Sequence, residues 1–366
     1  MKKLFLLLFL IFVSFTFGFK VTFIVYVPEN TPENSEIYIS GNFNNWSVND
    51  ENFKLIKKES YYMLETDLNG IIKFIITRGS TDTTEVIEKY RIARVSKDNI
   101  QIIARVKRWK DLIGKIELIE DFYSPELNNK RNIIIYLPPG YEKDTKSYPV
   151  LYLHDGQNLF DKKTAFVGVE WEVDETLDRM ISNDEIEPLI VVGIYNNADR
   201  LSEYSPWYDE EYKQGGKGDK YLEFVVKTLK PFIDENYRTI SDKNYIGGSS
   251  MGGLISLYGI SKYPDVFSGA IVMSPSFFFG NSKIFDFVEK KPPVNSRIYL
   301  YIGGKESENE RFLQEVIEMK ELLEDLNVNV KYSFDPEGVH NEAFWAKRFP
   351  EAIKWILEGT NWENLW

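Results

Sequence analysis

A serine flanked by glycines lies in the stretch Gly247-Gly248-Ser249-Ser250-Met251-Gly252-Gly253. The pattern G-x-S-x-G around Ser250 is typical of a nucleophile in a tight turn between a strand and a helix. Residues 244–246 are short and apolar enough to predict a buried strand, and the spacing of residues 254–260 predicts the helix. Side chains at Gly248 and Gly252 would collide with the neighbouring strand and helix. We therefore predict that Ser250 is a nucleophile at the carboxyl edge of a sheet.

A serine nucleophile needs a base, and the chain contains 2 histidines, His154 and His340. His340 lies in a loop between the last predicted strand, 329–334, and the last predicted helix, 342–357. This place, late in the chain, is where the base that takes the serine proton is expected. His154 follows an earlier buried strand, so we expect it to be structural.

An acid that orients His340 is expected after the predicted strand 297–302. Glu306 is nearest to the end of this strand, and we predict that it completes the catalytic triad. Glu308 is the main alternative because it lies in the same loop. Asp335 is a less favoured one.

Two backbone amides are expected to bind the oxyanion that forms when the serine attacks. One is the amide of Met251, which follows the nucleophile. The other is predicted in the turn after the buried strand 150–153, and we assign it to Gln157. His154 and Asp155 in this turn are adjacent possible metal ligands, but no third ligand cluster accompanies them, so we expect no metal.

The long segment from Asn196 to Gly218 has no regular period, and loops of this length are often functional. It contains Arg200, for which pairing with a nearby acid is favoured over binding a substrate carboxylate. Aromatic residues there and elsewhere, among them the run Phe277-Phe278-Phe279, could form the wall of an acyl or aryl pocket. We predict as substrate contacts, with ordinary packing as the alternative for each, Trp171, Trp207, Phe277 and Trp345.

The composition restricts the kind of protein that carries these residues. Its 366 residues allow one large domain and a small one, and 43% hydrophobic with 27% charged residues is typical of a globular protein. The net charge of −12 repels nucleic acid and anionic lipid, so neither is expected as a partner. The absence of cysteine excludes disulfides, thiolate metal sites and a cysteine nucleophile.

The start of the chain predicts a signal peptide over residues 1–18. A basic beginning precedes the apolar run 4–13, and Thr16 and Gly18 supply small residues for cleavage. An uncleaved anchor is the alternative, but the run is shorter than the ~20 residues that a membrane span needs. We therefore predict a secreted or periplasmic protein without a stable membrane anchor.

Residues 19–108 have the pattern of an all-β domain, and about seven short strands favour an immunoglobulin-like sandwich. The stretch from Ile37 to Trp46 resembles the early-strand signature of the glycogen- and starch-binding sandwich modules of amylolytic enzymes. Residues 70–74 resemble the strand that follows in those modules. Trp46 could stack on a sugar or fill the sandwich core, and the core position is favoured.

Residues 114–366 alternate strands and helices, which indicates a mostly parallel sheet. The order of nucleophile, acid and histidine is that of the α/β-hydrolase fold. The motifs of this segment together resemble the esterase D-type family, which includes feruloyl esterases, enterochelin-type siderophore esterases and mycolyltransferases. They are Tyr136 to Tyr141, Tyr148 to Gln157, the Ser250 turn, and Gly338 to His340. The resemblance implies a Ser-His-acid hydrolase without cofactor.

The prediction is thus an exported serine carboxylesterase in which water resolves an acyl-enzyme. Its substrate would be a small-molecule or glycan-linked ester, and acetyl or feruloyl groups on carbohydrates are our hypothesis. An acyltransferase of the same fold and a non-catalytic glycan-binding protein are the alternatives. The oligomeric state stays open.

Overall fold

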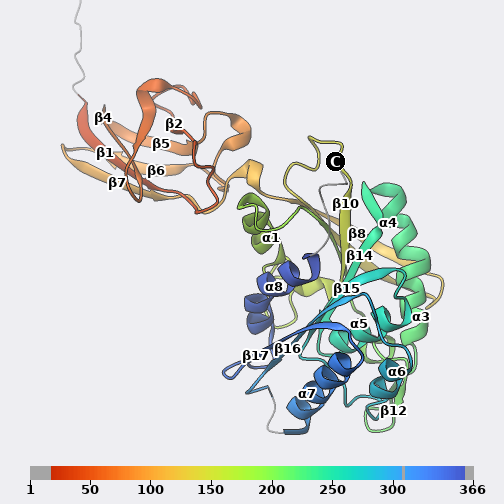
Figure 1. Ribbon diagram of the computed structural model, residues 1–366. Coiled ribbons are helices and arrows are strands. Elements are labelled where there is room, and N and C mark those ends of the chain that lie inside the picture. Colours follow the sequence, from red (N-terminus) through yellow and green to blue (C-terminus); the bar gives the residue numbers. More distant parts are fainter. Residues whose placement is uncertain (1–17, 307–309, 359–366) are drawn as a thin grey trace, which may run out of the picture. The chain divides into compact units, whose positions relative to one another are not determined.

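The computed structural model describes residues 18–306 and 310–358 (Figure 1). The chain divides into two compact units, Met1–Asp111 and Leu112–Trp366. The predicted signal peptide, apart from Gly18, and the alternative acid Glu308 lie outside the described residues. None of the described helices combines the length and apolar character needed to cross a bilayer.

The first unit is β-rich, as the sequence predicts. Its strands form one hydrogen-bonded series in the order β6-β5-β2-β3-β4-β1-β7. Strand β1 alternates buried and more exposed residues, which places Val21, Phe23 and Val25 in the core. The strand bounds are Phe19–Tyr26, Ile37–Gly41, Lys54–Lys57, Tyr62–Leu68, Gly70–Thr77, Arg91–Val95 and Ile100–Arg105 for β1 to β7.

Trp46 lies at the surface of the first unit, so the expectation that it fills the core is wrong. Its side chain is 40% exposed. The residue has a left-handed φ of 59°, and its N–H donates to the carbonyl of Gly41 at 2.8 Å. This turn directs the ring toward Tyr90, with 5.8 Å between the ring centroids. The tryptophan that is fully buried in this unit is Trp109.

The second unit is built on an eight-stranded mixed sheet in the order β17-β16-β15-β14-β10-β11-β9-β8. The pairs β8–β9 and β9–β11 are antiparallel, and the other pairs are parallel. Two short strands, β12 (Tyr208–Asp209) and β13 (Gln214–Gly215), form a separate pair. The main strands are β8 Lys115–Ser124, β9 Asn129–Leu137, β10 Tyr148–His154, β11 Ile190–Ile194, β14 Thr239–Ser249, β15 Phe267–Met273, β16 Arg297–Gly303 and β17 Asn329–Asp335.

Helices cover both faces of this sheet (Figure 1). Strand β10 is buried throughout: Val150 and Tyr152 belong to the core on one face, and Leu151 and Leu153 to the core on the other. Helices α1 and α8 pack on the second face, and α3 to α7 on the first. The helices are α1 Val173–Ser182, α2 Arg200–Glu203, α3 Gly218–Glu223, α4 Lys230–Asn236, α5 Met251–Lys262, α6 Ile284–Lys290, α7 Glu310–Asp325 and α8 Glu342–Leu357.

The parallel strands bring their carboxyl ends to one edge of the sheet. In the observed registers Leu153 pairs with Gly247, Ser249 with Met273, and Gly303 with Asp335. The loops after these strands therefore meet there, although they are far apart along the chain. They contain the predicted serine, acid and histidine.

Candidate active site

Ser250 occupies the turn between β14 and α5 in a strained backbone conformation, with φ 57° and ψ −120°. Its N–H donates to the carbonyl of Met273 at 2.9 Å. A Cβ on Gly248 would lie 3.0 Å from the carbonyl carbon of Gly252, and one on Gly252 would lie 3.3 Å from the Cβ of His154. The two glycines thus let the first turn of α5 and the turn after β10 approach the serine closely.

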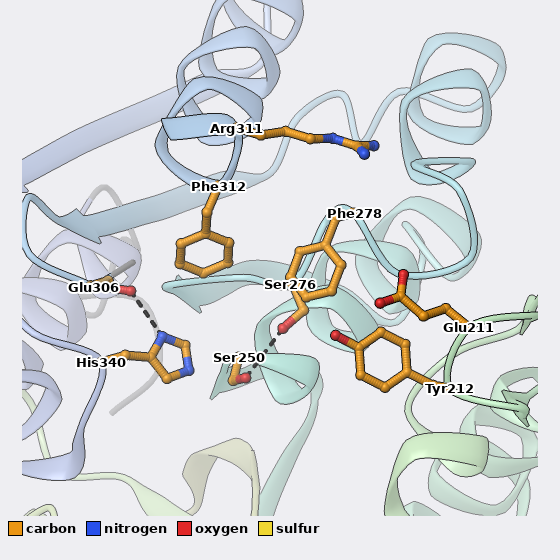
Figure 2. Close-up of a pocket in the computed structure, with 9 residues that line it drawn as sticks. All are labelled: Glu211, Tyr212, Ser250, Ser276, Phe278, Glu306, Arg311, Phe312 and His340. Atoms are coloured by element: carbon orange, nitrogen blue, oxygen red, sulfur yellow. Dashed lines mark hydrogen bonds and ion pairs between the residues drawn. The ribbon is translucent and has the colours of Figure 1, made fainter. Parts of the chain in front are cut away.

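Glu306 and His340 form a hydrogen-bonded pair, with 2.9 Å between Glu306 Oε2 and His340 Nδ1. The side chain of Glu306 is 1% exposed and that of His340 is 33% exposed. This contact holds the second ring nitrogen, Nε2, away from the acid. In Figure 2 the imidazole lies between Glu306 and Ser250. The structure therefore brings together the three residues predicted as a triad.

Asp335 is engaged elsewhere. Its Oδ2 accepts a hydrogen bond from Arg348 Nη2 at 2.5 Å, and its Oδ1 accepts one from the amide of Glu337 at 3.0 Å. The hydrogen bond from Arg348 lowers the pKa of Asp335 below its ordinary value. Its carboxylate is thus directed toward Arg348, while Glu306 contacts the histidine.

A cavity of about 450 Å³ opens around the serine and the histidine (Figure 2). The hydroxyl oxygens of Ser250 and Ser276 are 3.2 Å apart across its floor. The hydroxyl of Ser250 therefore has to turn from Ser276 toward His340 before the imidazole can take its proton. The lining residues are Glu211, Tyr212, Ser250, Ser276, Phe278, Glu306, Arg311, Phe312 and His340.

The two predicted oxyanion donors belong to the turns that follow β14 and β10. Met251 is the first residue of α5, and Gln157 lies in a 3₁₀ turn, Gly156–Asn158, after β10. This turn is held by Asp155, whose carboxylate accepts hydrogen bonds from Arg200 at 2.7 and 2.8 Å. Burial raises the pKa of Asp155, but the Arg200 guanidinium outweighs burial and lowers it below the ordinary value. Arg200 therefore pairs with an acid, as expected.

His154 is a buried core residue. Its Nδ1 lies 2.8 Å from the hydroxyl of Tyr221, and burial lowers the pKa of His154 to about 3. The imidazole is therefore neutral at physiological pH. The histidine that faces the cavity is His340.

The predicted aromatic contacts need correction, because none of the four lines the cavity. The side chains of Trp171, Phe277 and Trp345 are buried in the cores of the sheet. Trp207 packs against Tyr258, with 5.3 Å between the ring centroids. The aromatic wall consists instead of Tyr212, Phe278 and Phe312.

Two of these three wall residues lie in segments that the sequence singles out. Phe278 belongs to the predicted aromatic run 277–279, and Tyr212 lies in the long segment before α3. Phe312 lies on α7 and Ser276 follows β15, and no sequence pattern marked either residue.

One group of three carboxylates among the described residues is close enough to share a cation: Glu170, Asp174 and Glu175. The group lies at the start of α1, and none of its members lines the cavity. Burial and the neighbouring Glu175 raise the pKa of Asp174. Acidic residues are favoured at helix N-termini without a metal.

A family model matches most of the second unit. Residues 124–356 match the family model described as "Putative esterase". The uncharacterized protein YbbA of Bacillus subtilis is 27% identical over 253 residues, which cover 64% of this chain and 95% of that protein.

Two solved structures share the fold at low sequence identity. A ferulic acid esterase superposes with a TM-score of 0.54 at 20% identity. The aligned region covers 67% of this chain and 98% of the chain of that esterase. The enterobactin esterase of Shigella flexneri, whose structure was solved in the presence of enterobactin, superposes with a TM-score of 0.55 at 15% identity. The aligned region covers 96% of this chain and 95% of the chain of that esterase. Because the family model spans more than half of the sequence, this chain belongs to the esterase family and is a carboxylic ester hydrolase.

Proposed function

We propose that the protein is a serine carboxylesterase of the α/β-hydrolase fold, with Ser250 as nucleophile, His340 as general base and Glu306 as the acid. The observation that carries the proposal is the 2.9 Å contact between Glu306 and His340, in the cavity that also contains the strained Ser250. A buried carboxylate orients the imidazole and stabilises its positive charge after it has taken a proton.

The reaction follows from these positions in two steps. Ser250 Oγ attacks the ester carbonyl carbon while His340 Nε2 takes the hydroxyl proton. The amides of Met251 and Gln157 donate to the resulting oxyanion. The tetrahedral intermediate expels the alcohol, which receives the proton from His340, and the acyl group stays on Ser250. A water deprotonated by His340 then hydrolyses this acyl-enzyme and restores the free serine.

The cavity supports an acyl group with a planar aromatic part. Tyr212, Phe278 and Phe312 contribute apolar ring surface to a volume of about 450 Å³, and rings of this kind bind one another through offset or edge-to-face contacts. We therefore favour esters of hydroxycinnamic acids such as ferulic acid over acetyl esters. The fold shared with a ferulic acid esterase supports this choice.

Pre-steady-state kinetics with a chromogenic ester such as 4-nitrophenyl acetate tests the proposal. The wild-type enzyme should release a burst of nitrophenol proportional to enzyme concentration, because the acyl-enzyme forms before it is hydrolysed. Ser250→Ala should lose the burst and about 10³-fold or more of the turnover. Ser261→Ala, in the same helix, removes a buried hydroxyl without a hydrogen-bond partner and serves as control. Turnover by Ser250→Ala near the wild-type rate would refute the proposal.

We also propose that the first unit is an immunoglobulin-like sandwich that binds carbohydrate, so that ester groups on glycans are substrates. The half-exposed ring of Trp46, 5.8 Å from that of Tyr90, favours this second function. Lys73 Nζ lies 4.8 Å from the Tyr90 ring and adds a hydrogen-bond donor beside it. Export, which rests on the predicted signal peptide, is part of the same proposal.

A further inference from the structure

The segment after β15 contacts the acid that holds the histidine. Ser274 Oγ donates a hydrogen bond to Glu306 Oε1 at 2.6 Å. The indole N–H of Trp345 donates to the same Ser274 oxygen at 2.9 Å. Ser274 is fully buried, and its own N–H donates to the carbonyl of Tyr301 at 2.7 Å. The serine therefore links α8 and β16 to the acid of the active site.

The chemical groups involved determine which atom donates in each of these hydrogen bonds. The indole N–H is only a donor, so it occupies an acceptor position on the Ser274 oxygen. The single proton of the hydroxyl then remains for the carboxylate of Glu306. Trp345 thus turns Ser274 into a donor that points at the acid. This explains why Trp345 is buried here rather than exposed as a substrate contact.

Glu306 is held at both carboxylate oxygens. Oε1 accepts from Ser274 and from the amide of Gly303, each at 2.6 Å, and Oε2 accepts from His340 at 2.9 Å. A glutamate has three rotatable side-chain bonds, so its carboxylate needs such contacts to keep one orientation. Among the residues that the structure describes, His340 and Ser274 are the side chains that supply one.

We propose that Ser274 is a positioning residue for Glu306 and, through it, for His340. The inference rests on the proposed triad and goes beyond it, because Ser274 is fully buried and is not among the residues that line the cavity. Without the hydroxyl, Glu306 keeps the Gly303 amide but loses the donor that fixes its plane. The imidazole then spends less time in the orientation that accepts the proton from Ser250.

Loss of this donor has a second, electrostatic consequence. Hydrogen bonds to a carboxylate stabilise its negative charge. When one of them is removed, the carboxylate binds a protonated imidazole more strongly. The free enzyme should then keep the proton on its base to higher pH, and the acidic limb of the kcat/KM profile should move upward in pH. A purely structural role of Ser274 would not move this limb.

The test compares Ser274→Ala with wild type over a pH series, using a chromogenic ester. We expect kcat to fall about 10-fold with little change in KM, and the acidic limb to move to higher pH. Alanine keeps the Cβ of a residue whose φ is 43°, so it adds no backbone strain. Ser274→Cys keeps a weak donor and should lie between the two. Circular dichroism and the thermal midpoint monitor folding.

Ser333→Ala is the matched control. This serine lies on β17, and its hydroxyl also contacts a glutamate, with 3.3 Å to Glu351 Oε2, away from the cavity. It should leave kcat and the pH profile unchanged.

Ser250→Ala and Glu306→Gln, measured in parallel, distinguish a failure of the triad from a failure of the positioning role of Ser274. If both are strongly impaired and Ser274→Ala has the wild-type rate and profile, the positioning role is refuted and the triad stands. If Ser250→Ala or Glu306→Gln keeps wild-type activity, the triad fails, and the role of Ser274 fails with it.

Discussion

Ser250 carries backbone strain that its neighbours impose. Its φ of 57° with ψ −120° is a conformation that side-chain-bearing residues rarely adopt, and such strain costs of order 1–3 kcal/mol. The N–H of Ser250 donates to Met273, and its carbonyl accepts from the amides of Leu254 and Ser276. The reactive hydroxyl is thus placed by the backbone, and alanine at this position keeps the same constraints.

At the acid we expect Glu306→Gln to lower kcat by about 10²- to 10⁴-fold. The neutral amide cannot stabilise the imidazolium, and its NH₂ group can favour the wrong tautomer of His340. Asp335→Asn is the comparison, because it removes the same charge from a neighbouring strand end whose partner is Arg348. Steady-state kinetics and thermal unfolding of both variants check this. A greater loss of turnover in Asp335→Asn would reverse the assignment.

The buried His154 predicts how stability depends on pH. Burial lowers its pKa to about 3 in the folded protein, against about 6.5 in the unfolded chain. Between these values the unfolded state binds more protons, so the free energy of unfolding falls as the pH drops from 6.5 toward 3. From pH 7 to pH 5 this single residue should account for a loss of about 2 kcal/mol.

His154→Asn removes this titration and keeps a hydrogen-bond partner for Tyr221. Urea unfolding at pH 7 and pH 5 should show a smaller loss of stability in the variant than in the wild type. Equal losses of stability in both proteins would mean that His154 takes up its proton between pH 7 and pH 5 in the folded state as it does in the unfolded state.

For single residues, the sequence predicted which candidate catalytic side chains come together better than it predicted which aromatic side chains are buried. The structure brings Ser250, His340 and Glu306 together as predicted, because each follows a recognisable strand and strand ends determine their place. Trp171, Trp345 and the other predicted contacts were wrong because a residue type does not reveal which way its side chain points. Ser274 could not be found either, since a single serine after a strand has no pattern of its own.

The turn between β14 and α5 depends on the approach of two elements. A Cβ on Gly248 would meet the backbone of Gly252 at 3.0 Å, and backbone atoms cannot move aside as a side chain can. Gly248→Ala should therefore displace Ser250 and lower kcat/KM by about 100-fold. Steady-state kinetics and the thermal midpoint measure this.

Gly259→Ala provides the control in the same helix. The atoms nearest to its Cβ would be methyl groups of Ile246 and Leu222, at 3.1 Å, which can move aside more easily than backbone, and alanine favours a helix over glycine. Activity in this variant should be close to that of the wild type. A Gly248→Ala enzyme that is equally active would show that the close approach is unimportant.

Most of the elements of the second unit could be predicted from periodicity. Residues 218–236 form one helical stretch made of α3, a π-helical segment (Phe224–Leu229) and α4. The last helix has the predicted bounds, Glu342–Leu357. The pair β12–β13 and helix α6 were missed because two-residue strands and a seven-residue helix are too short to show a period.

On the scale of the whole molecule, we propose carbohydrate binding for the first unit and ester hydrolysis for the second. We expect Trp46→Ala in the full-length protein to reduce pull-down on insoluble polysaccharides and to leave turnover of a small chromogenic ester unchanged. The reason is that an exposed ring offers a stacking face that alanine lacks. Tyr123→Ala, which removes an exposed aromatic residue from the second unit, is the control.

Two results would contradict the carbohydrate proposal. One is equal binding by wild type and Trp46→Ala. The other is no binding by either protein to starch, glycogen or plant cell-wall polysaccharides. In both cases the first unit has another role, and the ester hydrolase of the second unit is unaffected.

In the proposed mechanism Ser250 forms the covalent intermediate. Reaction with a fluorophosphonate, followed by proteolysis and mass spectrometry, tests it directly, because the activated serine displaces fluoride and keeps the phosphonyl group. We predict a single adduct on the peptide that contains Ser250, its absence in Ser250→Ala, and much slower labelling in His340→Ala. An adduct on another residue, with Ser250 unmodified in an active enzyme, would contradict the account.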